Sequence, residues 1–152
     1  MVLNRQRRVR VSINDLEQFL ARARRALRLR SDSLTVSLVT NAKIARWNRA
    51  YRGKPKPTDV LSFPAENENA SREKPRAGVT RGRAPSARYL GDIAIAPAVA
   101  RRNARRLGRT FDNEMRILIL HGILHLMGYD HETDTGQMDR REQRLRRALG
   151  IA

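Results

Sequence analysis

The sequence predicts a single domain that combines strands and helices in layers, of either the α/β or the α+β class. Three observations support this prediction. The length of 152 residues suits one domain, the apolar content of 40% is enough for one core, and the apolar residues switch between strand-like and helix-like spacing. No internal repeat divides the chain. We therefore predict one domain over residues 1–152, with about four strands and about five helices.

The N-terminal part is predicted to form one strand and one helix. Residues 9–13 (VRVSI) alternate between apolar and polar residues, as a half-buried strand does. Asn14, with Glu17 three residues later, has the pattern of a capping box and is expected to open a helix that runs to about Leu29. Four apolar residues would share one face of that helix: Leu16, Leu20, Ala23 and Leu27.

Two further strands and a helix are expected before the middle of the chain. Residues 33–40 are largely apolar and β-branched and are predicted to form a strand, followed by a helix over about 41–51. The glycine and prolines in 52–58 end this helix, and residues 60–63 (VLSF) form the next strand. The segment 66–88 is polar and basic with several glycines and prolines, so we expect a mobile basic loop there.

The C-terminal half is predicted to be mainly helical. Residues 90–96 (LGDIAIA) form a fourth strand, and Pro97 suits the first turn of a helix that reaches Leu107. Thr110 can cap a strongly apolar helix that ends at Gly128. A last amphipathic helix is expected over about 134–149, with three apolar residues on its inner side: Met138, Leu145 and Leu149.

The composition narrows the choice of partners and compartment. The chain has 32 Lys and Arg against 15 Asp and Glu, a net charge of +17, which favours binding to a polyanion such as nucleic acid. Because 28 of the basic residues are arginine, a general bias in composition is the alternative explanation. There is no cysteine, so any metal must bind to His, Asp or Glu. No secretory or membrane-spanning segment is visible, and we expect a soluble, cytoplasmic protein.

All three histidines of the chain fall within the segment 121–131 (HGILHLMGYDH). His121 and His125 are four residues apart on a predicted helix, so both side chains project from one face and can reach one ion. Gly128 ends the helix, which allows the chain to turn back and present His131 as a third ligand. Three nitrogen ligands on a tetrahedral zinc ion leave one position for water, as in catalytic sites. The sequence therefore predicts one Zn²⁺ bound by His121, His125 and His131.

The alternative to a metal site is that these histidines lie close together by chance, as a lone H-x-x-x-H pattern often would. Asp130 is a candidate to hold a ligand imidazole through its second nitrogen, although it could equally be a simple turn residue. The histidines and glycine match the register of the metzincin protease motif H-E-x-x-H-x-x-G-x-x-H. The glutamate of that motif is replaced by Gly122, which removes the expected general base and disfavours a protease.

Residues His121 to His131 follow the pattern H-G-x-L-H-L-x-G-Y-D-H, which resembles the YbeY family of bacterial endoribonucleases that mature ribosomal RNA. Two more segments are similar to that family in the same order: YRGKPKPTDVLSFP at 51–64 and LGDIAIAP at 90–97. The resemblance covers most of the chain after the first helix. It implies an α+β fold with a small mixed sheet and a zinc site at one end. The long basic insert at 66–88 and the very high positive charge depart from what the resemblance leads us to expect.

The resemblance also implies a catalytic role for Arg52, which follows the tyrosine of Y-R-G. A guanidinium group binds a phosphate through two parallel hydrogen bonds and can stabilise charge that develops on it. Without that motif, an arginine in this chain would be interpreted as an ordinary surface residue. Asp59 and Ser62 are expected only to support the neighbouring loop and strand.

The histidine spacing and the positive charge predict a zinc site and a polyanionic partner, and the resemblance implies a zinc-dependent endoribonuclease. The resemblance further implies that it cleaves single-stranded RNA and acts on the 3′ end of small-subunit rRNA, with the ribosome as partner. The attacking group could be a zinc-activated water or a 2′-hydroxyl of the RNA. Two alternatives stay open at this stage. One is an RNA-binding ribosome-assembly factor with a structural zinc, and the other is a metallopeptidase with a metzincin-like site.

Overall fold

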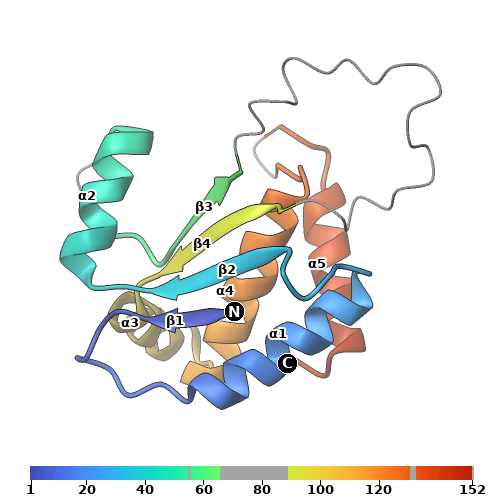
Figure 1. Ribbon diagram of the computed structural model, residues 1–152, viewed down its shortest axis with the longest axis horizontal. Coiled ribbons are helices and arrows are strands. Elements are labelled where there is room, and N and C mark those ends of the chain that lie inside the picture. The colour runs from blue at the N-terminus through green and yellow to red at the C-terminus, as the bar shows by residue number, and fades with distance from the viewer. Residues whose placement is uncertain (55, 66–88, 131–132, 152) are drawn as a thin grey trace.

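The computed structural model describes residues 1–54, 56–65, 89–130 and 133–151. These residues form a four-stranded mixed sheet with five helices packed around it (Figure 1). The strands are β1 (Val2–Asn4), β2 (Leu34–Leu38), β3 (Val60–Pro64) and β4 (Gly91–Ile95). The helices are α1 (Ile13–Ala26), α2 (Asn41–Arg52), α3 (Pro97–Leu107), α4 (Phe111–Leu126) and α5 (Gln137–Ala148). The α+β expectation is confirmed.

The sheet has the order β1-β2-β4-β3. The pairs β1–β2 and β2–β4 are parallel, whereas β3 runs antiparallel to β4 as an edge strand. In the register of this last pair, Val60 lies opposite Ile95 and Ser62 opposite Ile93. Side chains alternate between the two faces of a strand, so Ser62 and Phe63 project to opposite faces of the sheet.

Helix α4 is the central element of the core. It lies across one face of the sheet and contacts β3, β4, α1, α3 and α5 (Figure 1). Ten of its 16 residues are buried, because it has neighbours on several sides. A smaller apolar cluster on the other face joins Ile44 and Trp47 of α2 to Leu61 and Phe63 of β3. Helix α2 therefore packs against the edge strand on the face opposite α4.

Most of the expected elements appear close to their predicted positions. Helix α3 spans Pro97–Leu107 as predicted, and Thr110 caps α4 by accepting a hydrogen bond from the backbone N–H of Asn113 at 3.1 Å. Gly128 has the positive φ of +99° that allows the chain to turn after α4. The expected inner faces are buried as well, which includes Leu16 and Leu20 of α1.

The predicted strand at 9–13 is wrong, because the N-terminal strand is β1. The side chain of Gln6, which is buried, takes both backbone hydrogen bonds that Val9 would otherwise offer to a neighbouring strand. Its Oε1 accepts from the Val9 N–H and its Nε2 donates to the Val9 carbonyl, each at 2.9 Å. The alternation in 9–13 instead reflects the burial of Val9 and the packing of Val11 and Ile13 against the core.

The predicted capping box at the start of α1 is also wrong. Ser12, not Asn14, is the N-cap, and its side chain accepts a hydrogen bond from the Asp15 N–H. The carboxylate of Glu17 accepts instead from the backbone N–H of Val2, which ties α1 to β1. At the other end of the chain, α5 begins at Gln137, three residues later than expected. Asp134 lies before it and accepts from the N–H groups of Gly136 and Met138, each at 2.9 Å.

The expectation of a mobile basic loop at 66–88 falls outside the described residues. Across the residues that the structure does describe, none of the helices combines the length and apolar character needed to cross a bilayer.

Candidate active site

The two described histidines lie in a cleft of about 380 Å³ between β3 and the second half of α4. Arg52, the last residue of α2, lines one side of this cleft, and Asp130 lines it from the loop after α4. The residues that line the cleft are Arg52, Thr58, Asp59, Val60, Leu61, Ser62, Pro64, His121, His125 and Asp130. Segments from three regions of the sequence are thus brought together, as the motif positions led us to expect.

Helix α4 holds His121 and His125 so that their side chains face the same point. The Nε2 atoms of the two rings are 3.0 Å apart, and the ring planes are inclined by 76°. Both residues are half-buried within a helix whose other faces are packed against the core. The rigid packing of α4 therefore fixes the Cα positions of the pair, and their four-residue spacing places them one turn apart.

This geometry fits a bound metal ion. Two nitrogen ligands at about 2.0–2.1 Å from a tetrahedral ion lie roughly 3.3 Å apart, close to the separation of the two Nε2 atoms. His131, the third predicted ligand, lies outside the described residues. Within the described part of the chain, no group of three His, Cys, Asp or Glu residues is arranged to hold a metal. The pair is placed so that it could offer two imidazole ligands, and a complete site would need at least one more.

Gly122, where the metzincin motif has its glutamate, lies against the sheet. A Cβ atom at this position would lie 2.9 Å from both Cδ1 and Cγ2 of Ile93 on β4. Real Cβ atoms essentially never come so close to a neighbour. Glycine is therefore required for α4 to approach β4, and a carboxylate from position 122 cannot reach the cleft.

Glu142 of α5 is a residue of the site that the sequence reasoning missed. Its Oε1 lies 3.1 Å from Nδ1 of His121, on the side of the ring away from His125. A signal was present in the sequence, because Glu142 falls on the apolar stripe of α5, between Met138 and Leu145. An acid on the inner face of an amphipathic helix usually has a specific partner.

Asp130, the residue expected to hold a ligand imidazole, lines the cleft and also starts a turn. Its carbonyl accepts hydrogen bonds from the backbone N–H groups of Thr133 at 3.3 Å and Asp134 at 3.0 Å. The interpretation as a turn residue is thus supported by the structure. A role for its carboxylate toward a ligand histidine stays a prediction.

The position of Arg52 is set by the end of α2. Gly53 adopts a left-handed conformation with φ of +67° and ends the helix, which reverses the chain directly after Arg52. Buried Asn48 donates from its side chain to the carbonyl of Lys56 at 2.9 Å and so holds the following loop against α2. Arg52 lines the same cleft as the two histidines, as its motif position suggested.

Asp59 and Ser62 support the wall of the cleft. Asp59 accepts a hydrogen bond from the side-chain amide of Asn103 on α3 at 3.2 Å, and its carbonyl accepts from the N–H of Ala96 at 3.0 Å. The hydroxyl of Ser62 donates to the carbonyl of Gly122 at 3.3 Å, which joins β3 to α4 beside His121. Both residues thus have the supporting roles that were expected from the sequence.

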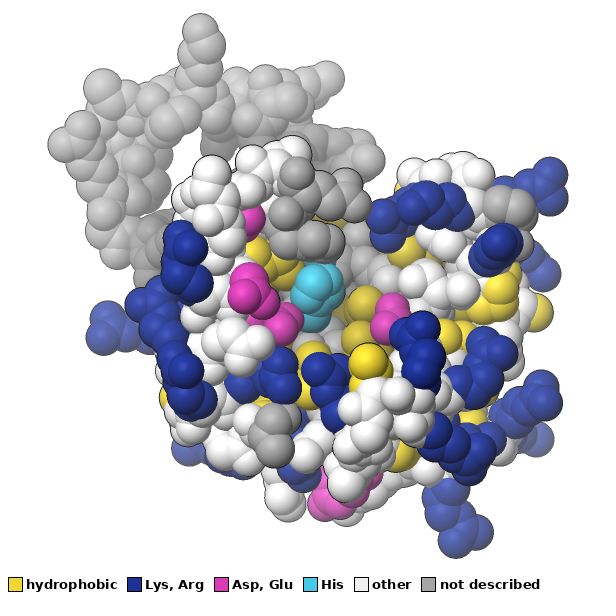
Figure 2. Space-filling view, turned by 180° about the vertical axis from the view of Figure 1, so that it is seen from behind, with side chains coloured by type: hydrophobic (Ala, Val, Ile, Leu, Met, Phe, Trp, Pro, Cys, Tyr) yellow, Lys and Arg dark blue, Asp and Glu magenta, His cyan; other side chains and the backbone are white. Residues whose placement is uncertain are grey.

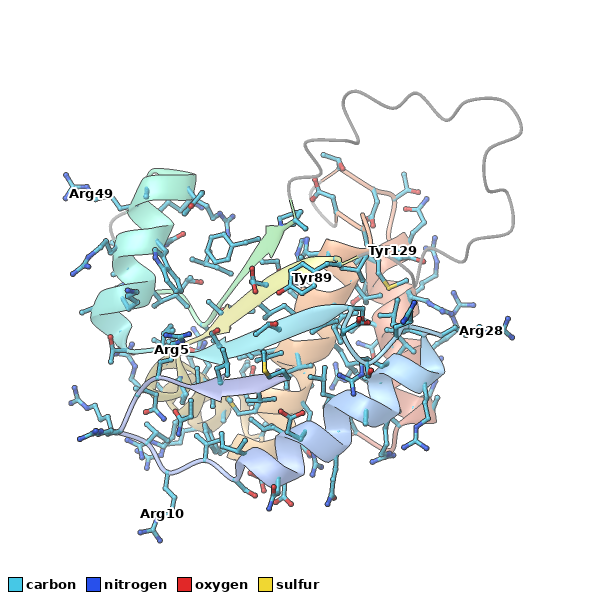
Figure 3. The ribbon with its side chains drawn as sticks, viewed as in Figure 1. Arg5, Arg10, Arg28, Arg49, Tyr89 and Tyr129 are labelled. Carbon is cyan, nitrogen blue, oxygen red and sulfur yellow. The ribbon has the colours of Figure 1, made fainter. Side chains whose placement is uncertain are left out.

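The cleft has a mixed charge within a basic surface. Figure 2 shows a histidine at the bottom of a hollow with acidic side chains beside it, and Lys and Arg side chains to both sides of the hollow. Other arginines project from widely separated parts of the molecule, including Arg10, Arg28 and Arg49 (Figure 3). The positive charge is therefore spread over the surface and is not confined to one stripe.

Known proteins of similar sequence and fold place the chain in a family. The sequence model described as Endoribonuclease YbeY matches residues 1–150. A protein named Endoribonuclease YbeY from Koribacter versatilis is 40% identical over 151 residues, which is 99% of this chain and 86% of that protein. Its namesake from Aquifex aeolicus is 37% identical over 131 residues, covering 86% of this chain and 77% of that protein.

A solved structure has a similar fold. The solution structure of TM1509 from Thermotoga maritima superimposes with a TM-score of 0.61 at 26% sequence identity, and the match covers 98% of this chain and 89% of that one. The family model matches nearly the whole length, and the motifs from Arg52 to Ser62 and from His121 to Asp130 meet in one cleft. The chain belongs to the YbeY family.

Proposed function

We propose that this protein is a zinc-dependent endoribonuclease that cleaves single-stranded RNA. The observation that carries the proposal is the pair of facing Nε2 atoms of His121 and His125 in a cleft that Arg52 also lines. Relatives over nearly the same length are named endoribonucleases, which supports RNA as the substrate. In the cell, we propose that the substrate is the 3′ end of small-subunit rRNA and that the protein acts on the ribosome in the cytoplasm.

We propose His121, His125 and His131 as the metal ligands. When bound there, zinc supplies a Lewis acid for a phosphoryl oxygen and activates water for attack. The chain's own residues bind and orient the RNA. The guanidinium of Arg52 can donate two parallel hydrogen bonds to the reacting phosphate and stabilise the negative charge that grows on it.

The proton of the attacking group needs an acceptor, and position 122 does not provide one. The described carboxylates that line the cleft are those of Asp59 and Asp130. Asp59 accepts a hydrogen bond from Asn103, and Asp130 lies on the exposed loop after α4. Both carboxylates are candidates to receive this proton. The same absence of a glutamate at position 122 argues against a metzincin-like peptidase.

The size of the cleft fits a single strand. A volume of about 380 Å³ is at the lower end of the range for ligand pockets and suits one nucleotide unit with its phosphate. The basic residues to both sides of the hollow can hold the backbone on either side of that nucleotide (Figure 2).

An RNA-cleavage assay with and without a metal chelator tests this function. The wild-type protein should cleave an unpaired RNA, lose activity after chelation and regain it with added zinc. His125→Ala should lose both zinc and cleavage, whereas the exposed variant Asp139→Asn, on α5, should behave as the wild type. Cleavage that survives complete removal of metal would contradict the proposal. Zinc-loaded protein that binds RNA without cutting it would favour the assembly-factor alternative.

A further inference from the structure

Glu142 lies behind His121 and outside the cleft. Its carboxylate is 3.1 Å from Nδ1 of His121, and its side chain is only 13% exposed. It is not among the residues that line the cleft, so it does not face a bound substrate. Its contact with the proposed site runs through the imidazole of His121.

Glu142 lies on the core-facing side of α5, at a position where an apolar residue would be expected. Met138, four residues earlier, is 1% exposed, and Leu145, three residues later, is 5% exposed. These spacings put all three on the face of α5 that packs against the core. An apolar side chain at position 142 would continue that stripe with no cost of removing a charge from water. The acid therefore interrupts the apolar stripe at the position that faces Nδ1 of His121.

We propose that Glu142 is a positioning residue that holds His121 in the tautomer and orientation needed to bind metal. This proposal rests on the zinc site proposed above. An ionised carboxylate can only accept hydrogen bonds, so the pair requires a proton on Nδ1 of His121. The lone pair of the imidazole is then on Nε2, the atom that faces Nε2 of His125 at 3.0 Å.

The tautomer matters because the two histidines can also bond to each other. When one Nε2 carries a proton, it donates a hydrogen bond to the Nε2 of the other histidine, and the pair cannot bind a metal. By keeping the proton of His121 on Nδ1, Glu142 removes one of the two ways to form this competing bond. The hydrogen bond to Glu142 also restrains rotation of the His121 ring before a metal binds. Less conformational entropy is then lost when the ring is fixed on the metal.

Zinc affinity, measured by competition with a coloured chelator, tests this role without relying on activity. Glu142→Ala should weaken zinc binding by about 10- to 100-fold, the usual effect of losing such a partner. Glu142→Gln keeps an acceptor oxygen and nearly the same shape, so it should weaken zinc binding less than Glu142→Ala does. Asp139→Asn removes an exposed acid from the same helix and should leave the affinity unchanged.

A cobalt(II)-loaded sample provides a second readout, because its visible spectrum reports the geometry of the ligands. Glu142→Ala should alter this spectrum, and Asp139→Asn should not. Unfolding of each variant in excess chelator separates positioning from a purely structural role. A structural role alone would lower the stability of the metal-free protein while zinc affinity and the cobalt spectrum stay as in the wild type, and this result would overturn the proposal.

The test also separates this proposal from the function on which it rests. A wild-type protein that binds no zinc would overturn the metal site and the role of Glu142 together. A wild-type protein that binds zinc, with unchanged affinity in both Glu142 variants, would overturn the role of Glu142 alone. If Glu142→Ala fails to fold, the nearly isosteric Glu142→Gln decides, with weakened affinity supporting the proposal and unchanged affinity overturning it.

Discussion

Gly122 of α4 and Ile93 of β4 are in such close contact that the helix and the sheet leave no room for a side chain at position 122. We predict that Gly122→Ala destabilises the protein although alanine favours helices. Overpacking typically costs 1–3 kcal/mol, whereas replacing glycine in a helix gains about 1 kcal/mol. The expected net loss in the free energy of unfolding is therefore up to about 2 kcal/mol, measured by chemical denaturation of the metal-free protein.

A double-mutant cycle identifies the cause of that loss. Ile93→Val removes Cδ1, one of the two Ile93 atoms that lie 2.9 Å from a Cβ at position 122. In the Ile93→Val background, Gly122→Ala should cost less than it does in the wild type. An equal cost in both backgrounds would show that the contact with Ile93 is not what requires glycine.

The ion pair between Arg109 and Glu114 should be important for stability. The two groups are 3.1 Å apart, and the side chain of Glu114 is only 3% exposed. Arg109→Ala would leave a buried carboxylate without this partner, which typically costs about 3–5 kcal/mol. Thermal and chemical unfolding at neutral pH should show this loss.

The chain offers a matched control for this pair on its surface. Arg30 and Asp32 are 3.7 Å apart with side chains 62% and 77% exposed, so Arg30→Ala should cost less than about 1 kcal/mol. The double variant Arg109→Met with Glu114→Gln should regain much of the stability lost in Arg109→Ala, because no buried charge remains. Similar losses for Arg109→Ala and Arg30→Ala would contradict the prediction.

The sequence predicted most of the fold, because the periodicity of apolar residues is a local signal. It is strongest in α1 and α3, and Pro97 and Thr110 mark the starts of α3 and α4. It failed at residues 9–13, where a buried side chain, Gln6, takes the place of a neighbouring strand. These hydrogen bonds join residues only three positions apart, and such local pairing of a side chain with the backbone competes with strand formation. The alternation of apolar residues alone cannot distinguish this arrangement from a strand.

Part of the site could be predicted because it depends on the spacing of residues within one helix. The spacing of His121 and His125 on one helix is a local property, and the structure brings their nitrogens together. Arg52, singled out by its motif, lines the same cleft, and its catalytic role stays a prediction. Glu142 was missed, since its contact with His121 joins two helices whose relative packing cannot be read from the spacing of residues within either one.

Tyr89 should ionise at unusually high pH. Burial, together with the hydrogen bond that its hydroxyl donates to Asp92 at 2.6 Å, raises the pKa of the Tyr89 phenol above its ordinary value of about 10. Its side chain lies beside β4 and also bonds to Thr35 of β2 (Figure 3). A raised pKa in the folded state means that the stabilising contribution is complete below pH 10 and disappears as the pH rises through the raised value.

Absorbance of the phenolate checks this prediction in an alkaline titration. In the wild type, part of the rise in phenolate absorbance should occur at a higher pH than for an ordinary tyrosine. This late component should be missing in Tyr89→Phe. Tyr129→Phe serves as the control and should keep it. A wild-type titration without the late component would contradict the prediction.

RNA affinity should fall steeply as salt rises. Each phosphate contact releases counterions, and for a single strand the slope of log K against log salt is about −0.7 per neutralised phosphate. With a net charge of +17 spread over the molecule, we expect several such contacts. Titrations with a non-cleaving variant, His125→Ala, would measure the slope, and a flat response would show that the basic surface does not contact the RNA backbone.

Arg52 should contribute more to the rate of cleavage than to the binding of RNA. It lines the cleft beside the two histidines, so its guanidinium can reach a phosphate held there. A donor aimed at charge that develops in the transition state affects the rate more than ground-state binding. Arg52→Ala should therefore slow cleavage by about ten- to a thousandfold, while RNA affinity falls only slightly because many other arginines remain.

Two further variants test whether the loss of rate is due to the guanidinium group of Arg52. Arg52→Lys keeps the charge but loses the planar pair of donors, so it should not restore the full rate. Arg49→Ala removes another arginine of α2, one turn earlier and outside the lining of the cleft, and should leave the rate near that of the wild type. Zinc content should be unchanged in all three variants. Normal cleavage by Arg52→Ala would reduce Arg52 to a surface charge, whereas loss of zinc would show that it maintains the structure of the site.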